Sequence, residues 1–203
     1  MRSSFFLVAL VFSLLGWTDP ALAEGTLWVN AENVLFVRTD EGFRIEISML
    51  VPVPLAIAWQ VLTDFAGMPR FVPNLESSRI ITGQGSNTVR VEQRGTASFG
   101  PFSQKFESVR EIEMRPMQEI HVRQLSGTAR RMESWMHLKN LGDQQTRLNY
   151  RAEIVADTLI PPLIGPTLLQ HEMAEQFSAM ISEMVKRNAP PKPVQAGSAT
   201  GSR

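Results

Sequence analysis

The sequence predicts a single α+β domain in which a curved antiparallel sheet of about six or seven strands lies against a long C-terminal helix. Between residues 77 and 156, short segments of alternating apolar and polar residues are separated by turn residues. After Ile160 the apolar residues recur at steps of three and four, which is the helical period. Strands joined by such short connections are antiparallel neighbours, and the apolar face of their sheet needs a long helix to cover it.

Residues 1–23 are typical of a secretory signal peptide. Arg2 supplies the positive start, residues 5–15 form the apolar stretch, and Ala21-Leu22-Ala23 is a small-x-small cleavage site. The apolar run is shorter than the ~20 residues of a membrane-spanning helix, although an uncleaved anchor is the alternative. We therefore predict a periplasmic or secreted protein that begins at Glu24 and is not an integral membrane protein after cleavage.

The composition limits the partners and the sources of stability. The 20 Lys and Arg residues balance the 20 Asp and Glu residues, so no long-range attraction to nucleic acid is expected. The chain has no Cys, which excludes disulfides and a lipoprotein anchor. Residues 24–188 are long enough to form one domain with a substantial core. Residues 189–203 are rich in Pro, Gly and Ser and are predicted to be a disordered tail.

The first elements are a hairpin and a helix. Residues 34–37 are expected to pair with residues 43–49 across the turn sequence Thr39-Asp40-Glu41-Gly42. Strict alternation in 43–49 places Phe43, Ile45, Ile47 and Met49 on one core face. An amphipathic helix then covers 54–65. Gly67, Pro69 and Pro73 break it, and a short second helix or a tight loop should follow.

The remaining chain supplies six strands and the long helix. The predicted strands cover 77–82, 88–98, 102–114, 119–126, 131–139 and 146–156. The helix is entered through Pro161-Pro162 and Gly165-Pro166 and should end near Asn188. Its apolar side is formed by Leu168, Leu169, Met173, Phe177, Met180, Ile181 and Met184.

The segment W-x-V-L-T-D-F, which begins at Trp59 and is followed by M-P-x-F-x-P-x-L, resembles the entry helices of the START-like (SRPBCC) superfamily. Within it, the resemblance is to the polyketide cyclase/dehydrase or coenzyme-Q-binding branch, and it covers residues 43–187. It implies a helix-grip fold with a deep apolar cavity between the concave sheet and the long helix. The helix that carries Trp59 would close one end. The motif concerns packing and identifies no catalytic residue.

Strand and helix periodicity assigns the side chains that should face the space between sheet and helix. The candidate ligand-binding residues are Gln93, Val122, Gln124, Met132, Ser134, Met136, Tyr150, Met173, Phe177 and Met180. A buried amide or hydroxyl needs a hydrogen-bond partner, so the polar members either pair with one another and with water or orient a polar ligand head. The Met residues either fill the core or form a deformable lining for an apolar ligand.

The residues that commonly carry catalysis form no recognisable site. His121 and His137 fall on the polar side of their strands, and no His, Cys or carboxylate lies at metal-ligand spacing, so we predict no metal site and no cofactor. There is no G-x-S-x-G motif, phosphate-binding Gly loop or Cys nucleophile. Asp64 at the helix end is interpreted as a solvated or capping residue rather than an acid or base.

Arginines and glutamates recur on the polar strand face. We interpret them as cross-strand ion pairs in contact with solvent, with a docking patch as the alternative. The arginines are Arg79, Arg90, Arg94, Arg110, Arg123, Arg131, Arg147 and Arg151.

Three functions are compatible with these observations. The favoured one is an exported binding protein that holds a hydrophobic small molecule or lipid between sheet and helix. The second is a cyclase or dehydratase-like enzyme on a polyketide-like substrate, for which Tyr150 is the one inward ionisable group by pattern. The third is a protein-interaction domain, favoured by an exposed Trp135 on a charged strand face.

Overall fold

The computed structural model describes residues 29–30, 33–99, 102–155 and 165–190. The elements in chain order are β1 (Leu35–Arg38), β2 (Phe43–Val51), α1 (Leu55–Leu62), the 3-10 helix η2 (Phe65–Arg70), β3 (Leu75–Thr82), β4 (Thr88–Phe99), β5 (Phe102–Arg115), β6 (Glu119–Gly127), β7 (Arg131–Gly142), β8 (Gln145–Val155) and α2 (Gly165–Asn188). The predicted signal peptide and residues 191–203 of the predicted tail lie outside the described residues.

The strands form one antiparallel sheet with the order β1-β2-β8-β7-β6-β5-β4-β3. It has eight strands rather than the expected six or seven, because the leading hairpin pairs along the whole of β8 and extends the sheet. From β3 to β8, every strand is hydrogen-bonded to its neighbour in sequence. The segment containing α1 and η2 carries the chain from β2 to β3 at the opposite edge of the sheet, which no short turn could do.

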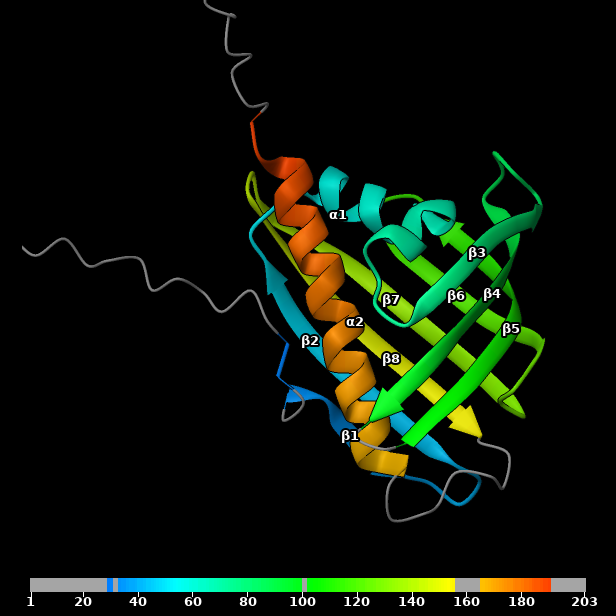
Figure 1. The fold of residues 1–203 in the computed structure, drawn as a ribbon. Coiled ribbons are helices and arrows are strands. Elements are labelled where there is room, and N and C mark those ends of the chain that lie inside the picture. Colours follow the sequence, from blue (N-terminus) through cyan, green and yellow to red (C-terminus); the bar gives the residue numbers. More distant parts are fainter. Residues whose placement is uncertain (1–28, 31–32, 100–101, 156–164, 191–203) are drawn as a thin grey trace, which may run out of the picture.

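Figure 1 shows α2 lying across one face of the curved sheet, with α1 and η2 near the C-terminal end of α2. We call the face toward α2 the inner face and the other the outer face. This arrangement confirms the predicted α+β fold. Within the described ranges, no helix combines the length and apolar character needed to cross a bilayer.

The core lies between the inner face and the helices. Alternate residues of β2 are buried, beginning with Ile45 and Ile47, as the alternation predicted. Alternate residues of β8 are buried in the same way, including Leu148 and Ala152. From α2, the buried side chains are Glu172, Ala174, Phe177, Ser178, Ile181 and Met184. Burial of this apolar surface is the main stabilising contribution to the fold.

The helical segment after β2 confirms the predicted helix and the predicted break. The Pro54 carbonyl accepts hydrogen bonds from the backbone N–H groups of Ile57 and Ala58, which starts α1. After Thr63, the Asp64 carboxylate accepts from the Gly67 N–H at 3.0 Å and caps η2. The predicted capping role of Asp64 is therefore confirmed.

Val29 and Val34, which precede β1, both contact α2. The backbone N–H of Val29 donates to the Ser178 hydroxyl at 2.8 Å. The side-chain amide of Gln170 donates to the Val34 carbonyl at 3.0 Å. Val29 and Val34 are both buried. These two residues thus cover part of one flank of the helix.

Candidate functional site

A row of polar side chains crosses the apolar inner face from β3 to β8. Strand register makes its members near neighbours: Ser78 opposes Gln93, Gln93 opposes Ser108, and Arg110 opposes Gln124. We call this row the polar belt; it consists of Ser78, Gln93, Ser108, Arg110, Gln124, Ser134 and Tyr150. Polar groups in such a place need partners or a ligand.

Tyr150 lies where the belt meets α2. Its ring packs edge-on against Phe177 with 4.9 Å between the ring centroids. Burial raises the pKa of Tyr150, while a hydrogen bond with Ser134 and the charge of Arg110 act in the opposite direction. The phenol is therefore neutral at physiological pH and can donate or accept a hydrogen bond. Met136 opposes Tyr150 on β7. Four of the predicted ligand-binding residues therefore lie together here: Ser134, Met136, Tyr150 and Phe177.

Arg110 belongs to the inner face, and its assignment to the polar face was wrong. It shares the parity of Ser108 and Ile112, which are both buried. Its Nε donates to the Ser108 hydroxyl at 3.0 Å. Burial lowers the pKa of Arg110, and the interaction with Tyr150 opposes that shift. Strand alternation already indicated the inner face, because Arg110 shares a face with Met114 and not with Glu111.

The two glutamines of the belt already have protein partners. The Gln93 amide donates to the Ser78 hydroxyl at 3.2 Å and lies 3.7 Å from the Met68 sulfur. The Gln124 amide donates to the Ala129 carbonyl at 2.6 Å. The NH₂ group of each glutamine therefore already donates a hydrogen bond to another group of the protein. Their roles in ligand binding stay a prediction.

The apolar candidates divide into a buried and a partly buried group. Met136 and Phe177 are buried in the core. The other four pack against the core but keep part of their surface accessible: Val122, Met132, Met173 and Met180. Both groups face the same space, as predicted from periodicity. Accessible apolar surface on an inner face is what a ligand would cover.

A hollow of about 930 Å³ is lined mostly by outer-face residues and also by Ile47 and Tyr150 of the inner face; the outer-face residues include Leu35, Glu46, Ser48, Trp135, His137, Asn149 and Arg151. Because most of the lining side chains alternate with the inner ones, the hollow differs from the cavity between sheet and helix that the resemblance implies. The predicted exposure of Trp135 is wrong, since its half-buried ring lies between His121, at 5.3 Å, and the Arg151 guanidinium, at 5.8 Å.

Ion pairs explain most of the charges on the outer face, as predicted. The cross-strand pairs include Arg79–Glu92, Arg90–Glu111, Arg123–Glu111 and Arg44–Glu153. His121 and His137 also lie on this face, paired with Glu133 at 2.7 Å and Glu119 at 3.2 Å. Among the residues whose placement is described, no three His, Cys, Asp or Glu side chains come together as metal ligands.

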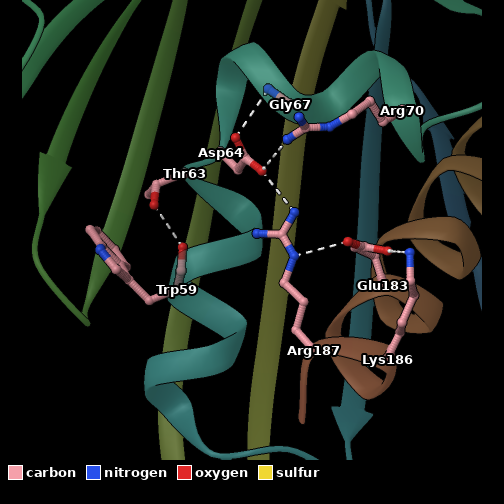
Figure 2. Close-up of polar contacts among 8 residues, drawn as sticks. All are labelled: Trp59, Thr63, Asp64, Gly67, Arg70, Glu183, Lys186 and Arg187. Atoms are coloured by element: carbon pink, nitrogen blue, oxygen red, sulfur yellow. Dashed lines mark hydrogen bonds and ion pairs between the residues drawn. The ribbon is translucent and has the colours of Figure 1, made fainter. Parts of the chain in front are cut away.

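Asp64 is held in a charged cluster that links η2 to the end of α2. Figure 2 shows Arg187 between Asp64 and Glu183, with Arg187–Asp64 at 2.7 Å and Arg187–Glu183 at 2.9 Å. Burial raises the pKa of Glu183, but hydrogen bonds from Arg187 and Lys186 outweigh it and the pKa lies below its ordinary value. We call Asp64, Glu183 and Arg187 the clamp. Its contacts fix the helical segment over one end of the inner face.

Glu172 is a buried carboxylate on α2. It is 4% exposed and accepts a hydrogen bond from the Asn74 amide at 3.1 Å. Asn74 has a positive φ of 64°, which an Asn tolerates better than most residues. The contact ties the turn before β3 to α2. No local pattern distinguishes Glu172 from the exposed glutamates of the same helix.

The comparisons with known proteins agree with this fold. A family model described as polyketide cyclase/dehydrase and lipid transport matches residues 51–186. The Zhui aromatase/cyclase from Streptomyces sp. R1128 superposes with a TM-score of 0.64 at 17% identity, covering 74% of this chain and 98% of that chain. A START superfamily protein from Mycobacterium smegmatis gives 0.61 at 13% identity, covering 71% and 98%.

Norcoclaurine synthase from Thalictrum flavum shares the fold with a TM-score of 0.54 at 12% identity, covering 77% of this chain and 98% of that chain. No curated protein matches the sequence. At these identities the solved structures show the fold alone. They confirm the predicted START-like helix-grip architecture, and the matching family model is that of the polyketide cyclase/dehydrase branch.

Proposed function

This chain belongs to the polyketide cyclase/dehydrase and lipid-transport family, and we propose that it is an exported protein that binds a hydrophobic small molecule or lipid. The ligand would lie between the inner face of the sheet and α2. The observation that supports this most is the inner face itself, where accessible methionines adjoin a row of neutral polar groups and one arginine.

The energetics are compatible with binding. Burying about ten methylenes of a ligand contributes ~8 kcal/mol before costs, at ~0.8 kcal/mol each. Association and ordering costs reduce this to a weak or moderate affinity. Methionines suit such a role because their unbranched side chains adapt to irregular apolar shapes.

Replacing Met180 with Trp should remove apolar cargo while leaving the fold intact. Met180 is only partly buried, so the larger ring can occupy ligand space. The fully packed Met136 provides the contrast, since Met136→Trp should destabilise the protein by ~1 to 3 kcal/mol through overpacking. Native mass spectrometry of protein purified from its source cells measures the cargo, and urea unfolding measures stability.

The matched control is Leu141→Trp, which adds the same ring at a position that is 37% exposed on β7. It should keep both cargo and stability. A wild-type protein that never carries or takes up an apolar molecule, together with strong destabilisation by Met180→Trp, would contradict the proposal. A packed interaction domain would then be the better description.

Export is the second part of the proposal and rests on residues 1–23. Protein recovered from outside the cytoplasm should begin at Glu24, as read by intact mass and N-terminal sequencing. A product that retains residues 5–15 would instead be tethered to the membrane. A Leu10→Arg change within the apolar stretch should prevent processing, which serves as the control.

An enzyme is the second candidate, and the neutral phenol of Tyr150 on the inner face, whose pKa the charge of Arg110 lowers against the effect of burial, is the observation that favours it. Cyclisation and dehydration need a proton carrier and a shaped site. A neutral phenol under the influence of a positive charge can donate a proton to a developing oxyanion and receive one back. Turnover of a polyketide-like substrate that Tyr150→Phe abolishes, without loss of binding, would favour this candidate.

A further inference from the structure

We propose that Arg110 makes the site selective for a single-chain amphiphile whose head is a carboxylate, with the head on the polar belt and the chain against the apolar inner residues. This inference rests on the proposed binding function and names its ligand class. It begins from the one feature of the inner face that apolar binding alone does not require, a cation.

The first argument is charge balance. Most outer-face arginines of the sheet have a carboxylate partner, as in Arg79–Glu92, Arg90–Glu111 and Arg151–Glu153. Arg110 is different: within the described ranges, the only side chain to which it donates a hydrogen bond is Ser108, which is uncharged. A desolvated cation without a counter-charge destabilises a protein. A ligand carboxylate would supply that charge.

The second argument is geometry. The Ser108 hydroxyl accepts a hydrogen bond from Nε of Arg110. The two terminal nitrogens of the guanidinium are left to donate to other acceptors. These nitrogens form a fork that matches the two oxygens of a carboxylate. Arg110 is partly exposed and burial lowers its pKa, so water screens its charge less than it screens the exposed arginines of the outer face. Ionic hydrogen bonds are strongest in such surroundings.

The third argument is the identity of the neighbours. Arg110 is close enough to Tyr150 for its charge to affect that phenol, and Ser134 hydrogen-bonds the same phenol. Both hydroxyls can donate to a head-group oxygen. The belt therefore offers one positive charge and neutral donors. That set suits a head group with one negative charge better than a cationic head group.

Isothermal titration calorimetry with three ten-carbon probes tests the inference. The probes are decanoate, 1-decanol and decylamine, which share a chain and differ in head charge. Full-length mature wild type should bind decanoate at least about tenfold more tightly than decanol, and decylamine most weakly. Arg110→Met should weaken decanoate by about ten- to a hundredfold and leave decanol within about threefold.

Two further variants separate charge from folding. Arg123→Met removes an arginine that is 53% exposed on the outer face of the neighbouring strand, and it should leave all three affinities unchanged. Arg110→Lys keeps the charge without the fork and should retain part of the preference for decanoate. Thermal unfolding of Arg110→Met should show no loss of stability, because an apolar side chain replaces a desolvated cation.

The outcomes distinguish the two proposals. Equal binding of decanoate and decanol by wild type, or unchanged decanoate binding in Arg110→Met, overturns the head-group inference and leaves the binding function standing. Failure of wild type to bind any of the probes overturns both. A preference for decanoate that disappears in Arg110→Met and persists in Arg123→Met supports both.

Discussion

Leu148→Ala is expected to lower the free energy of unfolding by about 3 kcal/mol. Leu148 is 1% exposed and lies in the middle of β8, between Met49 of β2 and Leu138 of β7. Truncation removes buried methyl groups and leaves a cavity among three paired strands, whose hydrogen-bonded backbones limit how far the neighbouring side chains can move to fill it. Urea unfolding followed by circular dichroism measures the change, which should shift the midpoint while the slope stays constant.

The matched control for this substitution is Leu50→Ala on the adjacent strand. Leu50 is 55% exposed and opposes Arg147 on the outer face. Its truncation should change stability by less than about 0.5 kcal/mol. Similar losses for the two leucines would mean that the assignment of inner and outer faces is wrong. That result would also remove the structural basis of the candidate ligand site.

The sequence predicted most of the fold because its signals are local. Alternation located the strands and short turns made them neighbours, so that the bounds of all eight predicted strand segments agree with the structure within a few residues. The number of strands was underestimated because the pairing of β2 with β8 joins segments about a hundred residues apart. Periodicity predicts which side chains of each strand are buried. It does not predict which strand lies beside it when the two are far apart in the sequence.

The candidate site was predicted in outline from the same alternation. Tyr150 and Ser134 lie together on the inner face, and Phe177 packs on Tyr150. Arg110 was missed because its charge was given more weight than its phase in β5. An arginine on an apolar face is rare, yet the position of Arg110 between the buried Ser108 and Ile112 already placed it on the inner side.

Sequence patterns could not identify the hydrogen-bond and ion-pair partners of the polar groups. Gln124 donates to a carbonyl in the following turn, and Glu172 contacts Asn74 about a hundred residues away. Such contacts depend on the final positions of loops, which no periodicity encodes. The clamp is the clearest case, because Asp64 and Arg187 are separated by 123 positions.

Arg187→Met should break the clamp and lower the free energy of unfolding by about 2 kcal/mol. Arg187 is 21% exposed and satisfies both Asp64 and Glu183, so its loss leaves two carboxylates facing each other (Figure 2). The control is Arg70→Met. Arg70 contacts Asp64 at only 3.4 Å and is 76% exposed, so its loss should cost less than about 0.5 kcal/mol.

The effect of Arg187→Met should also depend on pH in a defined direction. Hydrogen bonds from Arg187 and Lys186 outweigh burial and hold the pKa of Glu183 below its ordinary value of 4.5. A carboxyl with a depressed folded pKa stabilises the protein above its unfolded pKa and loses that contribution as pH falls through the folded value. The stability gap between wild type and Arg187→Met should therefore be full at pH 7 and shrink below about pH 4.5. A gap that stays constant from pH 7 to pH 3 would show that Arg187 acts through packing on Phe71, whose ring lies 5.5 Å from the guanidinium, rather than through its carboxylate partners.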